Sequence, residues 1–172
     1  MGYFAKLIYA DKFIVLDNVN FTKGSFIDRA QVINAQGEVI WIGMRVGQQF
    51  REKCNDIVLS DTGALERIIK TLHSAYARAR HFREGIGRLE SILMDGFNQG
   101  NKLSEINLRI ITGLMQMLDI RQPKVHLSSE FPERVDATDR LIELLSCVDC
   151  DQLITGSGGS LTKHDLKRLT GA

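Results

Sequence analysis

The sequence predicts an α/β protein, a single domain with a small mixed or mostly parallel sheet, a β-hairpin and about four long helices. Two features of the sequence lead to this prediction. Short runs of branched aliphatic residues, typical of buried strands, stand between longer segments in which apolar residues recur every three or four positions. The chain has 172 residues, of which 44% are hydrophobic and 25% charged, so it can bury one core of ordinary size.

Several short segments are predicted as strands because they are apolar and rich in branched residues. In chain order they are residues 12–17, the two arms 27–34 and 38–46 of a half-buried hairpin, and residues 57–59, 124–127 and 152–155. Gly37 lies between the hairpin arms and can supply the positive φ of a tight turn. We expect segments 12–17, 124–127 and 152–155 to share one sheet, because polar loops after such strands gather at one sheet edge.

The helices are predicted from apolar stripes at helical spacing. In chain order they are residues 2–10, 65–76, 82–94, 103–118 and 136–148, and a short last helix capped by Thr162 with Asp165 three residues on. The polar residues 60–62 precede segment 65–76 and should cap it with side-chain oxygens. Gly96 and Gly100 are expected in the loop that ends segment 82–94.

Charge and cysteine content limit the function classes. The formal net charge is +1, so no overall field favours nucleic acid. No apolar run approaches the ~20 residues that span a bilayer, and no signal-peptide pattern opens the chain, so we expect a cytoplasmic protein. Cys147 and Cys150 should be reduced and metal-free, because a structural zinc needs four ligands and no second cysteine pair exists. No motif indicates a metal or a cofactor.

The segment from Arg67 to Arg83 has the largest charge asymmetry in the chain. It contains two histidines and no acid, and its basic residues are Arg67, Lys70, Arg78, Arg80 and Arg83. Lys70 and His73 are three positions apart and therefore adjacent on a helix surface. Such cations can bind the phosphate of a nucleotide or a sugar. The alternative is a solvated basic helix end that complements the helix dipole.

Two further positions on that helix are candidates for acid–base chemistry. His73 is the best general acid or base, because it lies among cations and precedes Tyr76 by nearly one helical turn. Tyr76 also continues the apolar stripe, so a core position is the alternative.

Polar loops after the predicted strands are the other site candidates, since open α/β sheets bind ligands there. Segment 12–17 ends in Asp17, the loop after it contains Asn18, Asn20 and Lys23, and Ser129 follows segment 124–127. The segment after residues 152–155 offers backbone amides that can hold an anion, and its residues are Gly156, Ser157, Gly158 and Gly159. It matches neither the phosphate loop nor the dinucleotide fingerprint, and a flexible connector is the alternative.

Taken in order, several stretches of the chain resemble one family. They are Gly2-Tyr3-Phe4, the run from Ala10 to Lys23, the segment around Arg29, the run from His73 to Phe82, Ser128-Ser129-Glu130, the run from Thr138 to Ile142, and the run from Leu153 to Gly159. The sequence resembles the WbqC-like family of bacterial proteins, which are found with genes for O-antigen and other surface polysaccharides. Members usually begin with a strand before the Gly-Tyr-Phe and continue further after the glycine-rich segment, so we expect the chain to lack that strand and part of the carboxyl terminus.

The resemblance implies a cytoplasmic role in building or decorating a surface polysaccharide such as the O-antigen of lipopolysaccharide. It implies a nucleotide-activated sugar or another phosphate-bearing precursor as the ligand. A transferase fits this role, with Asp17 and His73 as acid–base candidates, Lys23 and Arg29 as anion clamps, and residues 156–159 as a phosphate cradle. The alternative is a non-catalytic ligand-binding or assembly subunit. A sheet edge left open by the absent strand would favour a homodimer.

Overall fold

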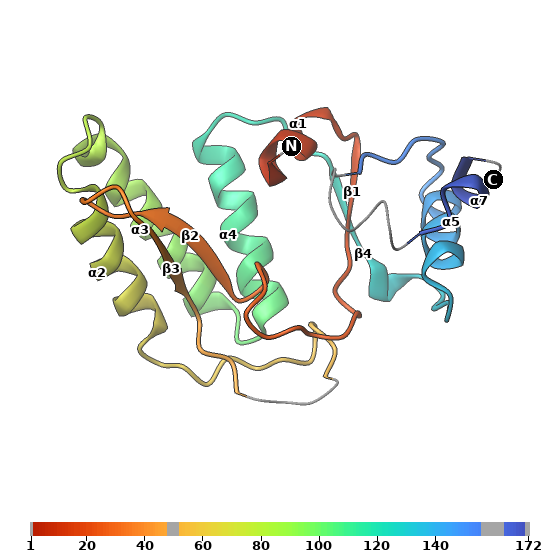
Figure 1. Cartoon of the computed structure of the whole chain (residues 1–172), viewed down its shortest axis with the longest axis horizontal. Coiled ribbons are helices and arrows are strands. Elements are labelled where there is room, and N and C mark those ends of the chain that lie inside the picture. The colour runs from red at the N-terminus through yellow and green to blue at the C-terminus, as the bar shows by residue number, and fades with distance from the viewer. Residues whose placement is uncertain (1, 48–51, 156–163, 171–172) are drawn as a thin grey trace. The chain divides into compact units, whose positions relative to one another are not determined.

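The computed structural model describes residues 2–47, 52–155 and 164–170 (Figure 1). The chain divides into two compact units, one formed by residues 1–18 and 120–172 and the other by residues 19–119. Each unit contains helices and paired strands. The predicted α/β class is therefore confirmed.

A short parallel sheet organises the first unit. Its elements are helix α1 (Tyr3–Tyr9), strand β1 (Lys12–Val15), strand β4 (Lys124–Leu127), the 3-10 turn η1 (Ser128–Glu130), helix α5 (Ala137–Cys147) and helix α7 (Leu166–Thr170). Strands β1 and β4 pair in parallel, with Lys12 opposite Lys124 and Val15 opposite Leu127. Two of the three segments expected to share a sheet therefore do so, and their carboxyl ends lie at the same edge.

The predicted strand at residues 152–155 is wrong. The structure assigns no strand there, and among the described residues β1 pairs with β4 alone. Leu153 and Ile154 are partly exposed, although their side chains are typical of a strand. A strand needs the hydrogen-bonding edge of a neighbour, which local composition cannot supply.

At the last helix, Thr162 lies outside the described residues, while the Asp165 carboxylate accepts from the amide of Lys167 at 3.0 Å.

In the second unit a hairpin packs against helices. Its elements are strands β2 (Arg29–Ile33) and β3 (Val39–Gly43) and helices α2 (Ala64–Tyr76), α3 (Phe82–Gln99) and α4 (Leu103–Met117). The strands are antiparallel, as predicted, and Gly37 in the turn has a φ of 84°. Figure 1 shows the hairpin beside α2. Val32 and Ile42 pack from the hairpin onto a core built around Ile68 and Leu72 of α2.

Three local predictions in this unit are corrected. Helix α3 extends through Gly96 instead of ending before it, and a Cβ on Gly96 would lie 2.8 Å from Cγ1 of Ile110 in α4. Glycine is therefore needed there for close helix packing rather than for a loop. Residues 57–59 form only a single bridge, between Val58 and Lys102. No side chain caps α2, because Gly63 is the residue at its N-cap, and the Asp61 carboxylate binds Arg67 instead.

Asp61 instead joins the end of the hairpin to helix α2. Its Oδ1 accepts from Nη1 of Arg67 at 2.9 Å, and its Oδ2 accepts from the amide of Arg45 at 3.0 Å. The hydrogen bond from Arg67 and that from Arg45 lower the pKa of Asp61 to about 2, although burial acts in the opposite direction. The carboxylate therefore stays ionised far into the acid range.

We expect this pairing to make stability depend on pH between about 4 and about 2. An unfolded carboxylate takes up a proton near pH 4, so in this window the unfolded chain binds more protons and stability falls as the pH falls. In urea titrations Asp61→Asn should cost about 1 kcal/mol near pH 5, a value reduced by solvent screening of the partly exposed Arg67. The difference from the parent protein should shrink toward about pH 2. An unchanged difference would contradict the prediction, and Asp56→Asn on the exposed surface is the control.

Candidate functional site

A buried polar network occupies the carboxyl ends of the two parallel strands. Asp17 follows β1 and is 4% exposed, and Ser128 and Ser129 follow β4. One Asp17 oxygen accepts from the Ser129 amide at 2.9 Å, and the other accepts from the Ser129 hydroxyl at 2.7 Å. The Ser128 hydroxyl lies 3.1 Å from Asp17 Oδ1. The two predicted site residues Asp17 and Ser129 are thus in direct contact.

Three further side chains extend this network. The Oδ1 atom of Asn18 lies 2.6 Å from the Ser128 hydroxyl and also accepts from the guanidinium of Arg140 on α5. The Nδ2 atom of Asn18 donates to Glu133 at 3.0 Å. The Nε atom of Arg140 is buried without a hydrogen-bond partner among the described residues. The strand ends therefore hold one partly buried cation beside carboxylates and hydroxyls.

Asp17 is an ionised acceptor in this network. Burial raises its pKa, but the hydrogen bonds from the Ser129 side chain and amide and from Ser128 outweigh burial, so the pKa lies below its usual value. An ionised carboxylate that already accepts three hydrogen bonds holds the two strand-end loops together. Ser129 itself is exposed, and it donates its proton to Asp17. Its oxygen lone pairs can therefore accept a hydrogen bond from a ligand.

In the second unit, Arg29 lies at the start of β2. Its guanidinium carbon is 3.9 Å from the centroid of the Trp41 ring. The preceding residue, Asp28, is buried and accepts from the amide of Gly24 at 3.2 Å, which stabilises the turn where Gly24 has a φ of 74°. Asn20 forms an isolated bridge with Lys53, and Lys23 is exposed.

Two polar side chains of helix α2 contact glutamates. Lys70 forms an exposed ion pair with Glu66 at 3.0 Å. His73 Nε2 lies 2.6 Å from Glu90 Oε1 of α3, so a carboxylate from a neighbouring helix faces an imidazole that the sequence places among cations. The hydroxyl of Tyr76 accepts from the amide of Ile33 at 3.2 Å, and its ring packs on the core. The position of Tyr76 supports the core alternative. Arg78 is exposed just beyond the helix.

The predicted site residues are distributed over both units. Asp17 and Ser129 belong to the first, whereas Asn20, Lys23, Arg29, Lys70, His73, Tyr76 and Arg78 belong to the second. Residues 156–159 lie outside the described residues. Convergence of these groups on one anion site therefore stays a prediction.

Comparison with known proteins places this chain in a family. The model of the WbqC-like protein family matches residues 1–166, nearly the whole chain. The chain belongs to the WbqC-like protein family. It is 24% identical over 156 residues to the uncharacterized protein Rv1507c of Mycobacterium tuberculosis. That match covers 90% of the WbqC-like chain and 66% of the relative. No solved structure matches the chain.

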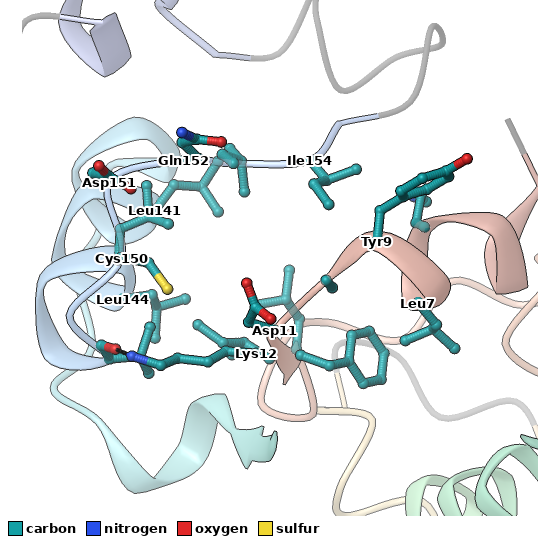
Figure 2. A pocket seen from close by; sticks show the side chains of 18 of the residues that line it. Leu7, Tyr9, Asp11, Lys12, Leu141, Leu144, Cys150, Asp151, Gln152 and Ile154 are labelled. Carbon is teal, nitrogen blue, oxygen red and sulfur yellow. Dashed lines mark hydrogen bonds between the residues drawn. The ribbon is translucent and has the colours of Figure 1, made fainter. Parts of the chain in front are cut away.

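The first unit of this WbqC-like protein also contains a cavity of about 510 Å³ (Figure 2). Its walls come from α1, β1, α5 and residues 150–154, and Leu141 and Leu144 of α5 supply much of its apolar lining. Burial raises the pKa of Tyr3, at its margin, to about 12. Of the predicted site residues that the structure describes, none lines this cavity. The cavity and the polar network around Asp17 therefore share no described side chain.

The sequence places Asn18 in the candidate loop after segment 12–17 without giving it a role. Sequence analysis did not identify Glu133 or Arg140 as site residues of the WbqC-like protein. Arg140 directly precedes Leu141 and Ile142, two residues of the apolar stripe in the predicted helix 136–148. A charged side chain next to a buried stripe is the sequence signal that points to it. Glu133 gave no comparable signal, because it comes from an irregular segment.

Among the described residues, no helix combines the length and apolarity needed to cross a bilayer.

Proposed function

We propose that this WbqC-like protein acts in the cytoplasm in the biosynthesis of a bacterial surface polysaccharide, as a transferase-type enzyme on a nucleotide-activated or other phosphate-bearing sugar precursor. The observation that carries the proposal is the network of Asp17, Ser128 and Ser129 at the carboxyl ends of β1 and β4. Open α/β sheets bind their ligands at this edge. The resemblance in the sequence supplies the polysaccharide context.

The proposed division of roles follows from the contacts. Asp17 positions Ser129, whose hydroxyl oxygen can accept from a sugar hydroxyl. Arg140 supplies a cation at the same sheet edge. Arg29, Lys23, Lys70, Arg78 and residues 156–159 are the proposed phosphate ligands, and His73 is the proposed acid–base group. A homodimer stays a prediction.

A non-catalytic ligand-binding role is the second candidate. The observation that favours it is the set of three hydrogen bonds that the Asp17 carboxylate accepts from Ser128 and Ser129. These hydrogen bonds stabilise the ionised form of Asp17 and so make it a weaker base. Binding without turnover does not require Asp17 to take up a proton.

Calorimetry with UDP-glucose, GDP-mannose and dTDP-glucose tests the proposal. We expect one of these donors to bind, and Ser129→Ala to weaken its binding by about 1.4 kcal/mol, or about tenfold, through loss of one hydrogen bond. Ser91→Ala, an exposed serine on α3, is the matched control and should bind normally. Release of nucleoside diphosphate over time, as the sugar passes to water or to the hydroxyl of an added acceptor sugar, would distinguish transfer from binding. If none of the three donors binds, or if both variants bind equally, the proposal fails.

A further inference from the structure

The hairpin of the second unit has an exposed aromatic face. Alternate residues of a strand point to opposite sides, and Val32 and Ile42 take the side toward α2. Trp41 takes the other side and is 43% exposed, and Phe26, in the loop before β2, is 74% exposed. Exposed aromatic rings in contact with each other present flat apolar faces on which a base can stack.

Phe26, Trp41 and Arg29 form one cluster. The ring centroids of Phe26 and Trp41 are 5.3 Å apart, with planes inclined at 50°. The Arg29 guanidinium lies over the Trp41 ring at 3.9 Å, within the range of a cation–π interaction. In the part of the chain that the structure describes, Arg29 forms no ion pair and its Nε is buried without a hydrogen-bond partner. The cluster therefore combines two ring surfaces with an uncompensated positive charge.

The backbone approaches Arg29 closely at two glycines. A Cβ on Gly43, opposite Arg29 in the hairpin, would lie 2.6 Å from the Arg29 Cα. A Cβ on Gly24 would lie 3.4 Å from an Arg29 Nη2 atom, so the loop passes close to the guanidinium. The buried Asp28 holds this loop through the Gly24 amide. The guanidinium is thus placed before any ligand arrives, which lowers the entropy cost of binding.

We propose that Phe26, Trp41 and Arg29 form a subsite for a nucleoside diphosphate. The base stacks on the exposed aromatic rings, and the guanidinium binds the diphosphate. Base stacking on aromatic side chains tolerates any base, and the arginine fork matches phosphate oxygens. This inference rests on the proposed function, because it assigns the nucleotide part of the sugar donor to a site on the hairpin.

Trp41 is the single tryptophan of the chain, so intrinsic fluorescence reports on this cluster. The full chain is titrated with UDP, with inorganic pyrophosphate, which lacks the base, and with methyl glucoside, which lacks both base and phosphate. We expect UDP to change the Trp41 fluorescence saturably and pyrophosphate to bind about tenfold more weakly, because it cannot stack. Methyl glucoside should leave the fluorescence unchanged.

Variants separate this subsite from binding elsewhere. Phe26→Ala and Arg29→Gln should each weaken UDP binding about tenfold. Ile33→Ala, an exposed apolar residue at the other end of β2, is the matched control and should bind normally. Circular dichroism checks that each variant folds. Phe26 is largely exposed, so its variant keeps the test valid if Arg29→Gln fails to fold.

Calorimetry on the same samples distinguishes the two proposals. Heat from UDP-glucose with no change in Trp41 fluorescence, and with normal affinity in Phe26→Ala, would overturn the subsite and leave the proposed function standing. Absence of heat with both UDP and UDP-glucose would overturn both. Saturable quenching that Phe26→Ala weakens would support the subsite.

Discussion

Replacing Asp17 by alanine should destabilise the protein by about 3 kcal/mol, because it removes the charged acceptor of a buried network. The Ser128 and Ser129 hydroxyls and the Ser129 amide all lose a partner that lies within 3.1 Å. The two strand-end loops then have less to hold them together. Urea titration measures the loss as a lower midpoint with an unchanged slope.

Asp11→Ala is the matched control for this change, since Asp11 stands just before the opposite end of β1. Its side chain is 82% exposed and forms an ion pair with Arg121. Exposed pairs of this kind contribute about 0.5 kcal/mol. A loss for Asp17→Ala as small as that for Asp11→Ala would show that the network does not stabilise the fold. At low pH, where the carboxylate of the parent protein is protonated, the parent should lose this stabilisation, and a smaller stability difference between parent and Asp17→Ala there would support the role of the charge.

Replacing Gly43 by alanine should also cost about 3 kcal/mol, through a clash with backbone that no side-chain rotation can relieve. The added Cβ would lie 2.3 Å from the carbonyl oxygen of Asp28 and 2.6 Å from the Cα of Arg29. Strands β2 and β3 must separate at this end to make room. The Arg29–Trp41 contact should open with them, so Trp41 fluorescence of the folded variant should change.

Gly47→Ala is the control, because a Cβ at Gly47 meets no atom of the described residues within 4 Å. Both variants exchange glycine for alanine outside a helix, so their effects on the unfolded chain are similar. Only the Gly43 variant introduces a clash. Equal urea midpoints for the two variants would contradict the close approach of the strands at Gly43.

Local elements of this chain follow from its sequence with small errors at their ends. The apolar stripe predicts a helix at residues 65–76, and α2 covers Ala64–Tyr76. Gly37 predicts a hairpin turn, and its φ is 84°. These features depend on residues a few positions apart, which the sequence displays directly. The exception is Gly96, where the reason for glycine is Ile110 of another helix.

Partners distant in the chain explain the remaining differences. Residues 152–155 have the composition of a strand but no strand edge to pair with among the described residues. His73 stands among cations in the sequence, yet Glu90, on the next helix, lies 2.6 Å away. Helix packing determines that contact, and the spacing of residues within α2 carries no information about it.

By itself the sequence determined the α/β class, the family resemblance and the polar ends of two strands, including Asp17 and Ser129. The tertiary structure alone decided that these two residues touch and that Asn18 and Arg140 join them. It also decided that Arg29 lies over Trp41. The physical reason is that periodicity records which face of an element is buried, whereas a hydrogen bond depends on which two elements the fold brings together.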